Sequence, residues 1–215
     1  MKQIEAVIFD LDGTLLNTLF DLTDSVNYTL EKYGMPQRSL EEVRAFVGNG
    51  IRNLMTQAVP DGESHPEFES LFAFFREYYK MHCNIKTAPY EGVMELLEEL
   101  KERDIKMAIV SNKIDSGVKE LNKIHFSEYI DVAIGEREGI GRKPEPDSVF
   151  EALRVLGVDA EHAVYVGDSD VDIQTARNAE VRCISVSWGF RDEAFLKENG
   201  ADIIIASPLE LLEYL

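Results

Sequence analysis

The chain has 215 residues, of which 45% are hydrophobic and 29% are charged, an ordinary composition for a globular protein. Its 40 Asp and Glu residues outnumber its 22 Lys and Arg residues, for a net charge of −18. This balance excludes a broad nucleic-acid footprint and disfavours an anionic membrane surface, because both need basic residues. The length suffices for one core with an inserted segment, and the core needs no disulfide or structural metal.

The N-terminal residues and the two cysteines predict a cytoplasmic protein. Met1 to Glu5 lack the apolar stretch of a signal peptide, and no run approaches the ~18 apolar residues of a membrane span. Cys83 and Cys183 match no metal-binding spacing, so we expect two reduced thiols. We therefore expect neither a membrane partner nor a nucleic-acid partner.

Short runs that are almost entirely apolar predict strands buried on both faces. They are, in chain order, Ile4–Asp10, Lys106–Ser111, Asp131–Ile134, Ala163–Gly167, Arg182–Val186 and Asp202–Ile205. Between them, apolar stripes such as Val93 to Leu100 and Val149 to Leu156 predict amphipathic helices. Capping-box sequences at Ser39 to Glu42 and at Ser207 to Glu210 predict two helix starts. The alternation predicts an α/β fold, a doubly wound and mostly parallel sheet.

Residues 16–85 interrupt this alternation, since they contain no convincing strand. Apolar residues from Leu22 to Tyr33 fit a helix that Gly34 would end, and an aromatic stripe from Phe68 to His82 fits a longer helix. The segment is too long for a simple crossover between parallel strands. We therefore expect an α/β core of residues 1–15 and 86–215, with a helical subdomain of residues 16–85 inserted after the first strand.

The first predicted strand ends in the sequence Asp10-Leu11-Asp12-Gly13-Thr14. Because alternate residues of an extended chain face the same way, Asp10 and Asp12 can present two carboxylates at the carboxyl edge of the sheet. Open α/β sheets bind their ligands at this edge. Gly13 leaves room where the backbone must turn or approach a ligand closely.

A second acidic group, Asp168 to Asp172, follows the predicted strand Ala163–Gly167. If that strand neighbours the first one, its carboxylates converge with the first pair, and several hard carboxylate oxygens suit Mg²⁺. A lone carboxylate at such a turn would more often cap a helix. A calcium loop of the EF-hand type is a further alternative. Its spacing fails, because position six is Ile173 instead of glycine and position twelve is Ala179 instead of glutamate.

Two further motifs complete a predicted phosphate site. Ser111 and the backbone N–H of Asn112 lie where a strand turns into a helix, a place that suits phosphate oxygens. Lys143 precedes Pro144, which favours an extended backbone and a fixed position over the sheet edge. A lysine of this kind is usually a solvated surface residue, but the neighbouring motifs favour a functional role here.

The ordered set of motifs resembles the four motifs of the haloacid-dehalogenase superfamily, over essentially the whole chain. These motifs are Asp10-x-Asp12-Gly13-Thr14, Ser111, Lys143 before Pro144, and Gly167-Asp168 with Asp172. Residues 16–85 resemble the small helical cap of that superfamily. Within it, phosphoglycolate phosphatases are most similar, through Gly48-Asn49-Gly50, Lys143-Pro144-Glu145-Pro146 and the segment from Ser187 to Arg191. One departure is Glu180, where such proteins usually carry glycine. At a positive φ this residue would cost on the order of 1 kcal/mol.

The resemblance implies a Mg²⁺-dependent phosphatase that hydrolyses a small phosphorylated metabolite, 2-phosphoglycolate above all, through an aspartyl-phosphate. It implies Asp10 as nucleophile and Asp12 as proton donor and acceptor. It implies a metal site of Asp10, the backbone carbonyl of Asp12 and Asp168. The implied phosphoryl ligands are Ser111, Asn112 and Lys143, with Lys113 as a further candidate. The implied supporting residues are Thr14 and Asp172. Asp172 would anchor either Lys143 or a metal-bound water.

Within the cap, we expect Asn49 to belong to a specificity loop and Arg52 to pair with a substrate carboxylate. The alternatives are an ordinary turn at Asn49 and a surface position for Arg52.

Other open functions are a phosphatase for pyrophosphate, a nucleotide or a sugar phosphate, and a phosphomutase similar to β-phosphoglucomutase. A non-catalytic binding protein is disfavoured because all the motif residues are present. We expect a monomer or a homodimer.

Overall fold

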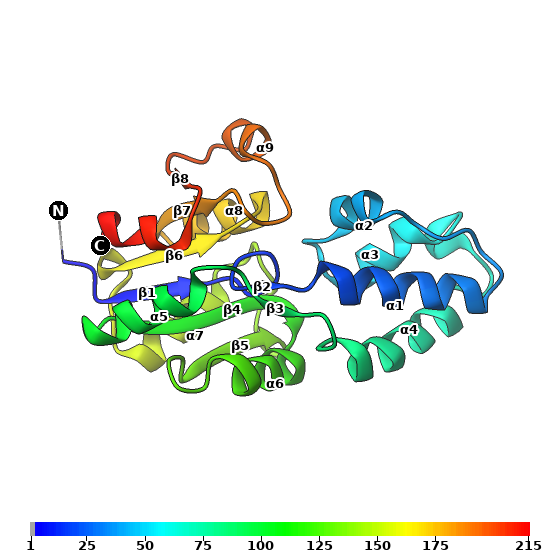
Figure 1. Cartoon of the computed structure of the whole chain (residues 1–215), viewed down its shortest axis with the longest axis horizontal. Helices are drawn as coiled ribbons and strands as arrows, with labels where there is room; N and C mark the ends of the chain where they lie inside the picture. The colour runs from blue at the N-terminus through cyan, green and yellow to red at the C-terminus, as the bar shows by residue number, and fades with distance from the viewer. Residues whose placement is uncertain (1–2) are drawn as a thin grey trace. The chain divides into compact units, whose positions relative to one another are not determined.

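The computed structural model describes residues 3–215, which divide into two compact units (Figure 1). The core unit comprises the chain up to Leu16 together with Pro89–Leu215, and the inserted unit is Asn17–Ala88. The boundaries expected from the sequence lay at residues 15 and 86. In the part of the chain that the structure describes, no helix is both long and apolar enough to cross a membrane.

The core unit is built on a six-stranded sheet with the order β5-β4-β1-β6-β7-β8. The strands are β1 (Ala6–Phe9), β4 (Lys106–Ile114), β5 (Val132–Glu136), β6 (Ala163–Gly167), β7 (Arg182–Val186) and β8 (Ile204–Ile205), and neighbouring strands pair in parallel. β1 lies between β4 and β6, so the ends of these three strands meet at one edge. β4 continues past the predicted end at Ser111, with a register shift between Val110 and Ile114.

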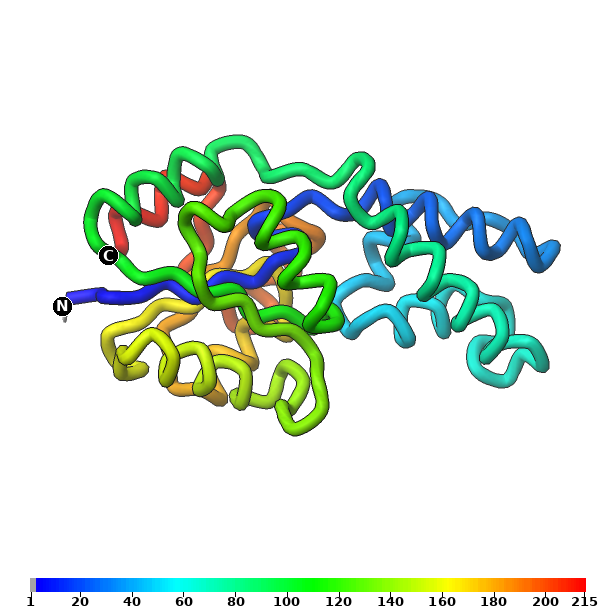
Figure 2. The backbone as a smooth tube through the Cα atoms, turned by 90° about the horizontal axis from the view of Figure 1, so that it is seen from below, coloured from blue at the N-terminus to red at the C-terminus, as the bar shows by residue number. Residues whose placement is uncertain are grey.

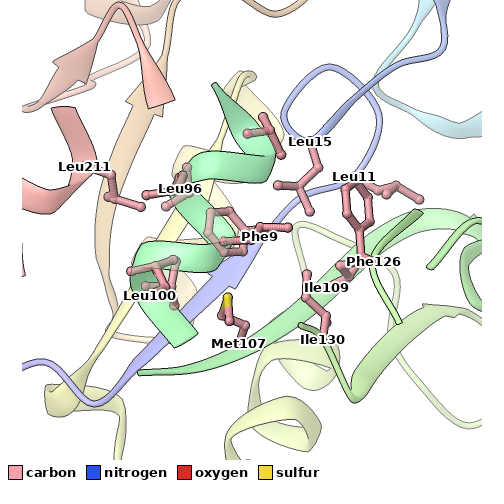
Figure 3. Packing of buried hydrophobic residues seen from close by; sticks show 14 of the residues in the cluster. Phe9, Leu11, Leu15, Leu96, Leu100, Met107, Ile109, Phe126, Ile130 and Leu211 are labelled. Carbon is pink, nitrogen blue, oxygen red and sulfur yellow. The ribbon is translucent and has the colours of Figure 1, made fainter. Parts of the chain in front are cut away.

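Helices cover both faces of this sheet, which confirms the predicted doubly wound α/β fold. They are α5 (Val93–Glu102), α6 (Asp115–His125), α7 (Asp147–Leu156), α8 (Asp170–Asn178) and α9 (Glu193–Glu198), with 3₁₀ turns η2 (Ala160–His162) and η3 (Pro208–Tyr214). Alternate residues of β1 enter two different apolar clusters. Phe9 packs with Leu96 and Leu100 of α5 (Figure 3), whereas Ile8 packs with residues of α7 and α8. Figure 2 shows α5 beside the C-terminal η3, with α7 on the other side of β1.

The inserted unit is helical, as the lack of strand patterns predicted. Its elements are α1 (Leu19–Lys32), α2 (Leu40–Phe46), α3 (Gly50–Ala58), the 3₁₀ turn η1 (Gly62–Ser64) and α4 (Phe68–His82). The two connections, β2 (Leu16–Asn17) and β3 (Ala88–Pro89), pair with each other. Asp21 ties the start of the unit to its end, because its buried carboxylate accepts hydrogen bonds from the N–H groups of Ile85, Lys86 and Thr87.

Of the two predicted capping boxes, only the one at Ser39 is present. Ser39 accepts from the N–H of Glu42, whose side chain accepts from the N–H of Ser39. The prediction at Ser207 is wrong: its side chain makes no capping bond, and the segment that follows is a 3₁₀ helix. The Glu210 carboxylate accepts instead from the N–H of Ala206, so it reaches one residue beyond the capping position.

Glu180 occupies the left-handed region, with φ of 55°. It ends α8 in a Schellman motif: its N–H donates to Arg177 O (3.2 Å), and the N–H of Val181 donates to Ala176 O (2.9 Å). Gly157 ends α7 at a similar φ of 66°. A glycine at such a position avoids the clash that a Cβ makes with the backbone.

We expect Glu180→Gly to stabilise the protein by about 1 kcal/mol, because it removes the strain of a side chain at positive φ. For a chain of this size, that corresponds to a rise in Tm of about 2–4 °C in thermal unfolding. Gly157→Ala is the matched control, since an added Cβ there meets no atom within 4 Å and brings only the strain. It should lower Tm, and an unchanged or lower Tm for Glu180→Gly would refute the strain.

Candidate active site

Three neighbouring strands bring the predicted motif residues together at the carboxyl edge of the core sheet. Asp10 follows β1, and its N–H extends the ladder to β6 by donating to Val166 O (2.9 Å). Asp168 follows β6, and Ser111 lies on β4. Lys143 comes from the segment between β5 and α7. All four side chains are buried, so the charges of Asp10, Asp168 and Lys143 interact strongly.

Lys143 is the central cation of the site. Its Nζ donates to Asp10 Oδ1 (2.8 Å), to Asp172 Oδ1 (2.8 Å) and to the hydroxyl of Tyr165 (3.0 Å). The prediction that Asp172 anchors Lys143 agrees with this geometry. Tyr165 was not predicted. It is the one polar side chain in the strand Ala163–Gly167, and a buried tyrosine hydroxyl needs a partner. That requirement is the signal that could have found it.

Asp172 has no acceptor capacity left for a metal ion. Its Oδ1 accepts from Lys143 and from the Tyr165 hydroxyl (2.9 Å). Its Oδ2 accepts from both the N–H (3.1 Å) and the Oγ (2.5 Å) of Ser169, within the capping box that begins α8. A carboxylate offers about four lone-pair positions, so these four donors fill them. Asp172 therefore supports the site through hydrogen bonds.

Asp168 is held by the first motif and by the segment that follows β7. Its Oδ2 accepts from the N–H of Phe190 (2.6 Å), and Thr14 Oγ1 donates to its Oδ1 (3.4 Å). Gly13 and Gly189 make this packing possible. A Cβ on either glycine would lie 2.4–2.5 Å from Asp168 Oδ2, closer than real contacts allow. Thr14 thus lies where the sequence placed a supporting residue.

The three buried carboxylates perturb one another. Asp10, Asp168 and Asp172 each place an oxygen within 4.8 Å of the others. Burial raises the pKa of Asp10 to about 7, although the nearby Lys143 opposes the shift. Burial, followed by repulsion from Asp172 and Asp10, raises the pKa of Asp168 well above its ordinary value. Burial alone would lower the pKa of Lys143, but the attraction of Asp10 and Asp172 outweighs it, so the pKa is raised.

This excess of buried negative charge fits a hard divalent cation. The free capacity lies on Asp10 and Asp168, both with oxygen donors, because Asp172 is saturated by hydrogen bonds. Carboxylate and carbonyl oxygens are the ligands that hard cations prefer, and no sulfur or imidazole lies in the cluster. The residues present therefore fit the metal site that the sequence predicted.

Asp12 and Lys113 form a second ion pair at the same edge. Lys113 Nζ lies 3.0 Å from Asp12 Oδ1, and the Lys113 side chain is only 7% exposed. Lys113 is therefore not a solvated surface lysine. The N–H of Lys113 also donates to Ser111 Oγ (3.2 Å). The side chain of Asn112, in contrast, bonds to the backbone of Lys143, so only its own backbone N–H matches the predicted role at a phosphate.

The two predicted cap residues lie in the inserted unit, on and before α3. Asn49 is the N-cap residue of α3 and makes no capping bond with its side chain. The guanidinium of Arg52 pairs with Glu63 (2.8 Å) and Glu69 and lies over the rings of Phe68 and Phe72. Arg52 thus binds within its own unit, and its contact with a substrate stays a prediction.

Comparison with known proteins decides the family. The family model described as haloacid dehalogenase-like hydrolase matches residues 7–186. The chain belongs to this family. Among members of known name, phosphoglycolate phosphatase 1 of Pseudomonas aeruginosa is 32% identical over 96% of this chain and 78% of its own. A protein of Caldanaerobacter subterraneus assigned as the pyrophosphatase PpaX is 34% identical over 98% of this chain and 94% of its own.

A solved structure agrees with this family. The crystal structure of a protein from Lactobacillus delbrueckii subsp. bulgaricus, assigned as a phosphoglycolate phosphatase, has a TM-score of 0.94 at 37% identity, and the match covers 99% of this chain and 98% of that one. These findings confirm the predicted haloacid dehalogenase-like fold. They also confirm the prediction of a phosphoric monoester hydrolase.

The metal-free protein should lose stability as the pH rises from about 4 to about 7. A carboxyl group whose pKa is raised from 3.8 to about 7 on folding binds more protons in the native state across this window, so raising the pH favours unfolding. In a chelating buffer, Tm should fall over this range.

Asp168→Asn removes one buried charge and should raise Tm at pH 7.5 by at least about 2 °C, or ~1 kcal/mol. The gain should shrink at pH 5, and an equal gain at both pH values would contradict charge repulsion.

Proposed function

We propose that this chain hydrolyses 2-phosphoglycolate to glycolate and inorganic phosphate with the help of Mg²⁺. The observation that carries the proposal is the arrangement at the sheet edge. There, one buried carboxylate, Asp10, is held by Lys143, while a second, Asp12, lies two residues on and pairs with Lys113 (3.0 Å). Relatives named phosphoglycolate phosphatases match this chain over almost its whole length, which supports the choice of substrate.

Mg²⁺ would be held by the side chains of Asp10 and Asp168 and by the backbone carbonyl of Asp12. When bound, it neutralises phosphoryl oxygens that would otherwise repel an anionic nucleophile. Asp172 stays in its hydrogen-bond network, because four donors already occupy it. Gly13 and Gly189 keep Asp168 close to the first motif.

Hydrolysis then proceeds in two displacements at phosphorus. An oxygen of Asp10 attacks phosphorus, the bond from phosphorus to the ester oxygen breaks, and Asp12 gives its proton to the departing glycolate oxygen. Asp12 next takes a proton from a water molecule, whose oxygen attacks phosphorus. The bond to Asp10 breaks, and inorganic phosphate leaves. Ser111 and the N–H of Asn112 bind phosphoryl oxygens. Lys143 lends its positive charge to the phosphoryl group while it holds Asp10, and Lys113 adds positive charge beside Asp12.

Pyrophosphate is the second candidate substrate, because a relative assigned as a pyrophosphatase is as similar as the phosphoglycolate phosphatases. The test is phosphate release from 2-phosphoglycolate, pyrophosphate, a nucleoside monophosphate and a sugar phosphate, each with Mg²⁺. The highest kcat/KM should belong to 2-phosphoglycolate. A tenfold preference for pyrophosphate would establish the second candidate. Conversion of one sugar phosphate to another without phosphate release would show a phosphomutase.

The same panel tests the cap residues. If Asn49 and Arg52 read the leaving group, Asn49→Ala and Arg52→Ala should reorder the substrates, and Ser111→Ala should depress all of them together. Losing one charge-assisted hydrogen bond should cost about 10- to 150-fold in kcat/KM for an acidic leaving group. Glu69→Gln is the control, because it loosens Arg52 without removing it. Equal losses on all substrates for both Arg52→Ala and Glu69→Gln would make Arg52 a folding residue.

Asp10→Asn should abolish turnover, since an amide does not attack phosphorus, while the near-identical shape preserves the fold. Asp12→Asn should slow both displacements by about 10²–10⁴-fold, because one side chain serves both proton transfers. Rapid-quench measurement of phosphorylated enzyme separates the two steps. Turnover by Asp10→Asn above a few per cent of wild type would show that Asp10 is not the nucleophile. A loss under tenfold in both steps for Asp12→Asn would show that Asp12 does not transfer the protons.

Chelation should stop the reaction, and Mg²⁺ should restore it, with Ca²⁺ a poor substitute. Mg²⁺ holds a tight octahedron at about 2.1 Å, whereas Ca²⁺ takes more ligands at longer distances than this site of two carboxylates and one carbonyl offers. Isothermal titration and phosphate release, each with Asp168→Asn as the control, give binding and activity separately. Full activity in EDTA would refute the metal requirement.

A further inference from the structure

The ammonium group of Lys143 has its full set of three hydrogen-bond acceptors. Two are carboxylates, Asp10 and Asp172, and the third is the hydroxyl of Tyr165 at 3.0 Å. An ammonium group has three N–H bonds, so these three partners fix its position and its rotation. Any change in one partner leaves an N–H without an acceptor in a place that water scarcely reaches, because Lys143 is 6% exposed.

Tyr165 differs from the two carboxylates because it is a neutral partner. It is fully buried in the middle of β6, and burial raises the pKa of its hydroxyl well above the ordinary value, so the proton stays in place. The hydroxyl therefore both donates, to Asp172 Oδ1 (2.9 Å), and accepts, from Lys143. The hydroxyl thus bridges Lys143 and Asp172, a contact that a phenylalanine at this position would lack.

Asn112 holds the same lysine at its other end. Its Oδ1 accepts from the N–H of Lys143 (2.9 Å), and its Nδ2 donates to the carbonyl oxygen of Lys143 (3.1 Å). One side chain from β4 thus binds both polar backbone groups of a residue that lies in no helix or strand. Asn112 therefore fixes the backbone at Lys143, just as strand pairing fixes the backbone at Asp10.

We infer that Tyr165 and Asn112 are positioning residues of the reaction, which act through Lys143 by holding its ammonium group and its backbone. The inference rests on the proposed function, because Lys143 binds the nucleophile Asp10 through Oδ1. If Lys143 moves, the attacking carboxylate loses its orientation, and a displacement of about 1 Å can cost on the order of 10²-fold in rate. Neither residue contacts the leaving group in this scheme, so the loss is the same for every substrate.

Two variants test the inference, each against a matched control. Tyr165→Phe removes only the hydroxyl, and Thr175→Val removes another buried hydroxyl, which bonds within α8 to Val171 O. Asn112→Ala removes the backbone clamp, and Asn122→Ala removes a similarly buried amide that donates to Ile130 O, remote from the site. Tyr165→Phe and Asn112→Ala should each lower kcat by about 10- to 100-fold on acetyl phosphate and 2-phosphoglycolate alike, with KM changed less than about threefold. Both controls should keep kcat within about twofold.

A double-mutant cycle gives a readout that does not need turnover. The loss of Tm caused by Tyr165→Phe should shrink by at least half when Lys143 is already Met, because the hydroxyl then has no ammonium group to bind. Additive losses, or a kcat of Tyr165→Phe and Asn112→Ala equal to that of their controls, would overturn the inference. If the wild-type protein releases no phosphate from any ester, the proposed function fails, and the cycle still decides whether Tyr165 holds Lys143.

Discussion

The contact between Lys143 and the buried carboxylates of Asp10 and Asp172 is the interaction on which the rest of the site depends. Three elements far apart in the sequence meet at this one ammonium group: β1 through Asp10, α8 through Asp172 and the segment before α7 through Lys143 itself. Removing one partner of a buried ion pair typically costs about 3–5 kcal/mol, because the other charge stays buried without compensation. The same contact that orients the Asp10 carboxylate thus also holds the edge of the sheet together.

The sequence was sufficient for the fold and for the place of the site, and the reason is geometric. Parallel strands put their carboxyl ends at one edge, so polar residues at the ends of β1, β4 and β6 must converge once those strands are neighbours. Runs without alternation identified strands buried on both faces, as the two clusters around Phe9 and Ile8 show. The left-handed conformation of Glu180 was expected only as a condition, from the glycine that similar proteins carry at this position, and the structure shows that φ is 55°.

What the sequence could not supply is the choice of partner for each side chain. Tyr165 lies in an apolar strand and is typical of the core, so only its hydroxyl indicated a partner, without saying which one. The saturation of Asp172 depends on the capping geometry of Ser169. The wrong capping prediction at Ser207 also concerns the choice of partner. Its four-residue spacing fits an α-helix, but the segment packs beside α5 as a 3₁₀ helix, and the Glu210 carboxylate accepts from the N–H of Ala206 instead of from that of Ser207.

The charges at the site explain how a chain with a net charge of −18 can act on an anion. Two lysines, Lys113 and Lys143, are each already paired with aspartates, so neither is an unpaired positive charge that would attract a phosphate by itself. The carboxylates of Asp10, Asp12, Asp168 and Asp172 face two ammonium groups, so the site would carry a formal charge of −2 if all four were ionised, and one divalent cation would bring this sum to zero. A bound cation would therefore do more than activate the phosphoryl group. It would turn a cluster that repels an anion into one that tolerates it, while Lys113 and Lys143 stay beside their aspartates. Local pairing, rather than the net charge of the chain, sets the potential that a substrate meets.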